Sequence, residues 1–159
     1  MSDRTLINQS IVCRSPEETF DLGTKLADEL REQDIVLLQG ELGAGKTLLT
    51  KGVLHGLDFD TDEVTSPSFA LVNLYRTVKF DVYHIDLWRI EASENAGFEI
   101  GLEEILDEPK AVVIIEWAER LGNYRFNSWV FDIHIDGDGE DPRTITIEKR
   151  KPAAADSVK

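Results

Sequence analysis

The chain has 159 residues, with 17 basic and 31 acidic side chains and a net charge of -14. Such an acidic balance argues against general binding of nucleic acid phosphates, so any RNA contact has to be local or made through a partner. The single Cys13 excludes an internal disulfide, and no apolar run is long enough to span a bilayer. We expect a cytoplasmic protein with one domain over residues 1–150, a disordered tail over 151–159 and no membrane segment.

The first predicted elements are a strand over residues 5–13 and a helix that starts at Ser15-Pro16-Glu17-Glu18. Serine is a preferred cap, proline suits the first turn, and glutamate three residues after the cap completes a capping box. Apolar residues at helical spacing extend the helix to Leu30. We interpret Ser15 first as a helix cap, with contact to a ligand as the alternative.

A phosphate-binding pattern follows, Gly40-Glu41-Leu42-Gly43-Ala44-Gly45-Lys46-Thr47. It stands between an apolar run at 35–38, typical of a central parallel strand, and a helical pattern over 46–55. Lysine at this place reaches the β- and γ-phosphates of a nucleotide, and the threonine hydroxyl binds Mg2+. The predicted nucleotide-binding residues of the loop are Leu42, Gly43, Ala44, Gly45, Lys46 and Thr47.

The middle of the chain predicts a hydroxyl-rich loop, a hairpin and short helices. Thr65-Ser66-Pro67-Ser68 carries three hydroxyl side chains that are able to contact phosphate or Mg2+, although such clusters are most often ordinary turns. Residues 70–75 and 78–87 read as two antiparallel strands, and 91–107 as short helices broken at Gly97 or Gly101. The hairpin makes the predicted sheet mixed.

The most hydrophobic run, at residues 111–115, predicts a second central parallel strand that ends in Glu116-Trp117. Residues 129–135 and 143–149 alternate and predict a second hairpin, whose acidic turn does not fit a calcium-binding loop. The predicted fold is therefore α/β: a single P-loop NTPase-like domain with a mixed, mainly parallel central sheet flanked by helices, with antiparallel hairpins.

Carboxylates at strand ends are the candidates that complete the site. Hydrolysis by a phosphate-loop protein usually needs an acidic residue at the end of a neighbouring strand, to hold Mg2+ or to orient water. Glu116 is the first candidate, because it follows the buried run and emerges where open α/β sheets bind ligands. Asp86 is the second, with a structural role equally open, and His84 shares its strand face as a hydrogen-bonded structural histidine. The predicted catalytic residues are Lys46, Asp86 and Glu116.

These motifs, taken in order, resemble the TsaE (YjeE) family of small bacterial ATPases. The resemblance covers roughly residues 22–117, through the phosphate loop, Thr-Ser-Pro-Ser-Phe, His84-Ile85-Asp86-Leu87-Trp88-Arg89 and Ile115-Glu116-Trp117. It implies an ATP- and Mg2+-dependent subunit that acts with the TsaB and TsaD proteins and binds where those two meet. The implied reaction is the threonylcarbamoyl modification of adenosine 37 in tRNAs that read ANN codons, with tRNA contacted only indirectly, through the complex.

The resemblance also implies roles for particular residues. It implies Mg2+ binding by Thr47, Glu116 and Asp86, a switch region over 65–68 that includes Thr65 and Ser66, and a nucleotide near Ser15. Two residues depart from the family pattern: Trp88 stands where tyrosine is usual, and Ser68 where threonine is frequent. Both replacements keep the chemical character, so they affect fine contacts rather than activity.

Two other functions use the same loop. A small-molecule kinase is the main alternative, although the sequence shows no basic cluster that would serve as its mobile lid. A GTPase-like switch is the other, and the sequence has no Asn-Lys-x-Asp segment to read guanine.

Overall fold

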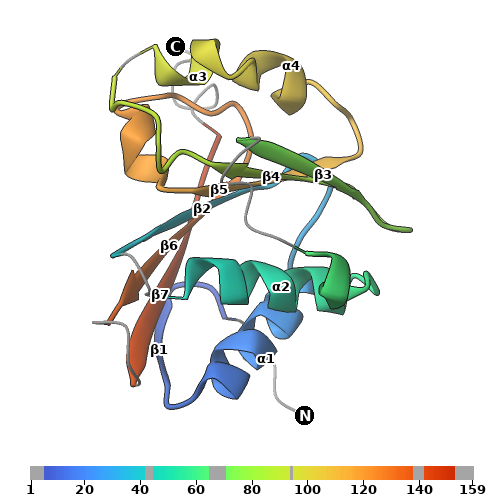
Figure 1. The fold of residues 1–159 in the computed structure, drawn as a ribbon, viewed down its shortest axis with the longest axis vertical. Coiled ribbons are helices and arrows are strands. Elements are labelled where there is room, and N and C mark those ends of the chain that lie inside the picture. Colours follow the sequence, from blue (N-terminus) through green and yellow to red (C-terminus); the bar gives the residue numbers. More distant parts are fainter. Residues whose placement is uncertain (1–5, 42–44, 65–70, 94, 138–141, 153–159) are drawn as a thin grey trace.

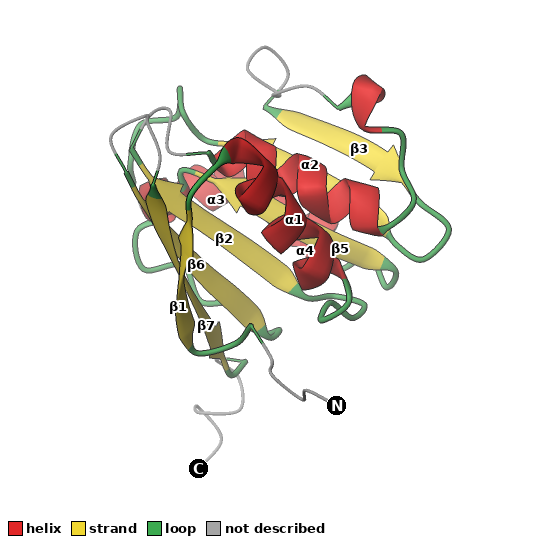
Figure 2. Ribbon diagram, turned by 90° about the horizontal axis from the view of Figure 1, so that it is seen from below, coloured by secondary structure: helices red, strands yellow, loops and turns green. Residues whose placement is uncertain are grey.

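The computed structural model describes residues 6–64 except 42–44, 71–93, 95–137 and 142–152 (Figures 1 and 2). Predictions for Leu42, Gly43 and Ala44, for the loop with Thr65 and Ser66, and for the tail beyond 152 lie outside the described residues. In chain order the elements are β1 (Gln9–Cys13), α1 (Pro16–Ala27), β2 (Ile35–Gly40), α2 (Lys46–Gly56), η1 (Thr61–Glu63), β3 (Val72–Arg76), β4 (Asp81–Asp86), α3 (Ala96–Glu99), α4 (Leu102–Leu106), β5 (Ala111–Glu116), η2 (Ala118–Leu121), β6 (Val130–Asp136) and β7 (Arg143–Arg150).

The strands form one seven-stranded sheet in the order β1-β7-β6-β2-β5-β4-β3. The four strands in the middle, β6, β2, β5 and β4, run parallel to one another. The hairpins β3-β4 and β6-β7 and the pair β1-β7 are antiparallel. The predicted mixed sheet with two hairpins is therefore confirmed, and its parallel pairs are all central.

Helices cover the sheet on both faces (Figure 1). α1 and α2 pack on one face, and α3, α4 and η2 lie over the other. Every residue of β5 is buried, as the continuous apolar run predicts for a strand covered on both sides. Successive side chains of β5 point to opposite faces of the sheet and belong to two separate hydrophobic cores. Ile114 packs on the side of α1 and α2, and Ile115 on the side of α3 and α4. No helix in the described ranges is long and apolar enough to cross a membrane.

The start of α1 confirms the predicted serine cap, whereas the glutamate of the predicted capping box bonds to the residue before the cap. The Ser15 hydroxyl accepts a hydrogen bond from the backbone N–H of Glu18 at 3.2 Å, and the Glu18 carboxylate accepts one from the Arg14 N–H at 3.0 Å. The helix ends at Ala27, three residues before the predicted end at Leu30. Leu30 is nevertheless buried, in the core between the sheet and the helices α1 and α2. The helical break near Gly101 is also confirmed: Gly101 adopts φ 70° between α3 and α4, and Gly97 lies inside α3.

Two glycines let α1 and α2 approach closely, as Figure 2 shows from their side of the sheet. A Cβ on Gly52 would lie 2.1 Å from the carbonyl oxygen of Phe20, and one on Gly23 would lie 2.3 Å from that of Leu49. The clash would be with backbone, which cannot rotate away as a side chain can. The position of α2, and with it of the phosphate loop at its start, depends on this contact.

We predict that Gly52→Ala lowers the free energy of unfolding by about 1–3 kcal/mol, the usual cost of forcing a methyl group into a filled core. Urea denaturation measures the change. Lys51→Ala, at the neighbouring half-buried position of the same helix, is the control and should shift stability by less than about 0.5 kcal/mol. Equal stability of the two variants would contradict the close packing.

Candidate functional site

Three strand ends meet beside the start of α2. β2, β5 and β4 are parallel and in register, with Leu38 opposite Glu116 and Asp86 opposite Glu116. Their carboxyl ends therefore lie at the same edge of the sheet, where open α/β sheets place ligands. The phosphate loop leaves β2 at this edge, and Gly45 caps α2 with φ 112°, a backbone angle that favours glycine.

Glu116 is the centre of the polar contacts at this edge. Its carboxylate accepts from the Thr47 hydroxyl, which lies 3.3 Å from both carboxylate oxygens. The second partner is Nε2 of His84, in contact with Oε2. Glu116 is only 3% exposed, so these bonds compensate for much of the hydration that the charge loses. The structure thus brings into contact two of the residues for which the resemblance implies Mg2+ binding, Thr47 and Glu116.

Lys46 is buried in the phosphate loop. Its ammonium group donates to the carbonyl oxygens of Gly40 at 2.6 Å and Glu41 at 3.1 Å, and lies 4.2 Å from the ring centroid of Trp117. Lys46 is only 5% exposed, and this burial lowers its pKa from the ordinary 10.5. Nearby carboxylates, of which Glu116 has the largest effect, partly offset the lowering of the pKa. The ammonium group is therefore held between the end of β2, Glu41 and Trp117, and its contact with phosphate stays a prediction.

Trp117 follows Glu116 in a left-handed conformation, with φ 59°. Its N–H donates to the carbonyl of Leu38 at 3.1 Å, so the turn that ends β5 is tied to β2. Its ring meets Lys46 on one hand and Trp88 on the other, with 4.7 Å between the two indole centroids. Trp88, which stands where the family usually has tyrosine, thus packs against Trp117.

Asp86 lies at the same edge with a different set of contacts. Its Oδ1 accepts from the Trp88 N–H at 2.9 Å, which fixes the turn after β4, and the side chain is 7% exposed. It is one of the carboxylates that act electrostatically on Lys46. Its catalytic or metal-binding role stays a prediction, as does nucleotide contact by Ser15, whose hydroxyl caps α1.

The part of the chain that the structure describes contains no cluster of three or more His, Cys, Asp or Glu side chains able to hold a metal. Mg2+ does not require such a cluster, because proteins usually bind it through one or two carboxylates together with phosphate oxygens and waters. A hydroxyl and a carboxylate in contact, as at Thr47 and Glu116, are oxygen ligands of the required kind.

Arg143 is a site residue that the sequence analysis missed. A Cβ on Gly45 would lie 3.4 Å from its Nη1, so the guanidinium packs against the phosphate loop, and the residue is buried. The signal was present in the predicted hairpin: because β7 runs antiparallel to β6, its first residue lies at the edge where β6 and β2 end.

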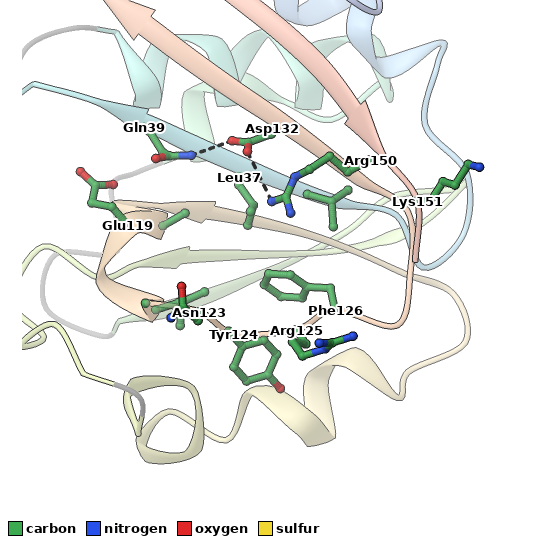
Figure 3. Close-up of a pocket in the computed structure, with 14 residues that line it drawn as sticks. Leu37, Gln39, Glu119, Asn123, Tyr124, Arg125, Phe126, Asp132, Arg150 and Lys151 are labelled. Carbon is green, nitrogen blue, oxygen red and sulfur yellow. Dashed lines mark hydrogen bonds and ion pairs between the residues drawn. The ribbon is translucent and has the colours of Figure 1, made fainter. Parts of the chain in front are cut away.

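A pocket of about 900 Å³ lies on the sheet face opposite α1 and α2 (Figure 3). Its lining includes Tyr124 and Phe126, with ring centroids 4.9 Å apart. On its sheet side Gln39 donates to Asp132 at 2.6 Å, and Asp132 pairs with Arg150 at 3.3 Å. None of the residues that line the pocket makes a hydrogen bond to Lys46 or Glu116 among the described contacts, although Glu119 in its lining acts electrostatically on Lys46.

Comparison with known proteins gives a consistent result. The model of the family described as "Threonylcarbamoyl adenosine biosynthesis protein TsaE" matches residues 13–145. Proteins named "tRNA threonylcarbamoyladenosine biosynthesis protein TsaE" are 39% identical over 123 residues in Nostoc sp. (75% of each chain) and 42% over 104 residues in Synechocystis sp. (65% of this chain, 66% of that one). The relative from Rickettsia felis is 38% identical over 69% of this chain, which spans 62% of that protein. The crystal structure of Bacillus subtilis YdiB superposes with a TM-score of 0.65 and 29% identity, covering 87% of this chain and 84% of that one.

We predict that Lys46→Met leaves the thermal midpoint of the nucleotide-free protein unchanged or raises it. The lowered pKa means that folding disfavours the charged lysine; this cost is present at neutral pH and disappears as the pH rises through the lowered pKa toward 10.5. Methionine of similar length removes the buried charge. Lys51→Met on the same helix is the control. A fall of more than about 4 °C, about 1 kcal/mol for a chain of this size, would contradict the prediction.

Proposed function

The chain belongs to the TsaE family, and on this premise we propose that it binds and hydrolyses ATP in the synthesis of threonylcarbamoyladenosine in tRNA. In the full proposal the target is adenosine 37 of tRNAs that read ANN codons, and the chain acts in the cytoplasm together with TsaB and TsaD. Support comes from the names of its relatives, which state this biosynthesis. The net charge of -14 supports a subunit that meets tRNA through its partners.

The observation that carries the ATPase proposal is the contact between Thr47 and Glu116 beside the buried Lys46. The hydroxyl belongs to the first turn of α2 and the carboxylate to the end of β5, so two elements supply adjacent oxygen ligands. In our proposal these two side chains bind Mg2+, with Asp86 close to the same edge as a further carboxylate. Magnesium, when bound, neutralises charge that develops on the β- and γ-phosphates.

The phosphate loop binds the triphosphate. Lys46 now donates to the carbonyls of Gly40 and Glu41, and we propose that it exchanges these for β- and γ-phosphate oxygens. The first N–H groups of α2 have no partner within the helix and point to the same place, where the helix dipole also favours an anion. The backbone of Leu42, Gly43, Ala44 and Gly45 adds further donors in the proposal.

Glu116 and Asp86 act on the reaction itself in the proposal. Carboxylates at this edge are able to orient the attacking water, and their burial at 3% and 7% exposure strengthens their electrostatic effect. Ser15, Thr65 and Ser66 complete the proposed nucleotide contacts. Low activity of the isolated chain, raised by the partner proteins, belongs to the proposal.

We predict that Lys46→Ala and Glu116→Ala each lower phosphate release from ATP by at least about 100-fold, since each removes a charge that acts on the transferring phosphoryl group. Release is measured with purified chain alone and with TsaB and TsaD present. Lys51→Ala is the control, because Lys51 is on the same helix as Lys46 but outside the site, and it should keep normal activity. Full activity in both site variants would refute the assigned residues.

A further inference from the structure

His84 is completely buried at the edge of the site. It is 0% exposed and lies on β4 opposite Ile114, so Glu116 is its diagonal neighbour two residues along β5 on the same face of the sheet. Its Nε2 contacts Oε2 of Glu116, and the ring of Tyr75 lies 6.5 Å away. The expectation of a hydrogen-bonded histidine is therefore right, and its partner is the central carboxylate of the site.

The contacts of the two ring nitrogens indicate which tautomer a neutral imidazole adopts here. A neutral imidazole has one donor nitrogen and one acceptor nitrogen. Nδ1 is buried and has no hydrogen-bond partner among the described residues, whereas Nε2 meets a carboxylate oxygen, which can only accept. The neutral tautomer with its proton on Nε2 suits both nitrogens better than the reverse. His84 is thus a fixed donor to Glu116.

Packing alone does not explain a histidine at this position. Its neighbours on the same face include Val82 and Ile114, both fully buried, and an apolar side chain would fill the same space without desolvating two ring nitrogens. The cost is offset by the bond to Glu116. The bond also restricts rotation of the Glu116 side chain, because the buried ring of His84 holds one of its carboxylate oxygens.

We propose that His84 is a positioning residue for magnesium: its Nε2–H holds Oε2 of Glu116, which keeps the carboxylate beside the Thr47 hydroxyl and leaves Oε1, which His84 does not contact, available to the ion. The inference rests on the proposed function and deepens it. A carboxylate with one oxygen bonded to a fixed donor has one oxygen left for the metal. Such outer partners usually contribute 10–100-fold to metal affinity.

The test compares His84→Leu with His84→Gln. Leucine keeps the apolar volume and removes the donor; glutamine places its amide nitrogen the same number of bonds from Cβ as Nε2 of histidine. Isothermal titration with ADP, in Mg2+ and in EDTA, gives the factor by which Mg2+ strengthens ADP binding. We expect His84→Leu to reduce this factor at least about tenfold, with ADP affinity in EDTA unchanged within about twofold, and His84→Gln to restore most of it.

Val82→Ala is the matched control, since Val82 is a fully buried residue on the same face of β4 that donates no side-chain hydrogen bond. It should lower stability and leave the Mg2+ factor unchanged. An undiminished factor in His84→Leu, no recovery in His84→Gln, or an equal loss in Val82→Ala would overturn the inference. If His84→Leu does not fold, His84→Asn replaces it, because its shorter amide does not reach Glu116.

A second measurement needs no variant. The ¹⁵N chemical shifts of the imidazole of His84 in the nucleotide-free protein should show a protonated Nε2 and a bare Nδ1, and the reverse assignment would overturn the inference. Failure of the proposed function looks different: wild-type protein that does not bind ADP, or binds it equally with and without Mg2+, would refute the magnesium site itself and the inference with it. Failure of the inference alone leaves the wild-type factor intact.

Discussion

The burial of one carboxylate organises this edge of the molecule. Glu116 lies between β2 and β4 because three parallel strands end in register, and at 3% exposure its charge would cost several kcal/mol without hydrogen-bond partners. The partners come from two other elements, Thr47 on α2 and His84 on β4. The polar contacts therefore connect the phosphate-loop helix to two strands of the sheet, and the close glycine contact between α1 and α2 holds that helix from the other side.

A buried cation faces this carboxylate. Lys46 is covered by Trp117 and by loop carbonyls, and burial outweighs the neighbouring carboxylates in setting its pKa. A buried charge lowers the stability of the fold, and natural selection keeps such a residue where function requires it. The left-handed Trp117 belongs to the same group, since a bulky residue with positive φ stores strain beside the site. Lys46 is thus held by neutral partners, two carbonyl oxygens and an aromatic ring.

Local patterns in the sequence predicted most of the fold, because strand, loop and helix have different periods. Glu116 was predicted for a related reason: strand direction alone decides which edge its last residue reaches. The contact of His84 with Glu116 was not predictable, since alternation assigns a face but register between β4 and β5 decides which side chains meet. The predicted hairpin places Arg143 at the right edge of the sheet, but its contact with Gly45 also depends on the pairing of β6 with the distant β2. The predicted helix was too long because Leu30 continues the apolar spacing although α1 ends at Ala27. Leu30 is apolar because the core buries it, not because it belongs to the helix.

The order of the strands in the sheet differs from their order in the chain, and this affects how the protein folds during translation. β2 carries the phosphate loop but is flanked by β5 and β6, while β1 pairs with β7. During translation the strand that leads into the loop is made well before the strands that cover its two edges, and non-local pairing of this kind is slow to form. Both edges of β2 are covered only when β6 (Val130–Asp136) has been synthesised and has paired with it. A nascent fragment that ends before β6 would expose the edge of β2 that β6 covers in the folded protein, and unpaired strand edges of this kind make a folding intermediate prone to aggregate.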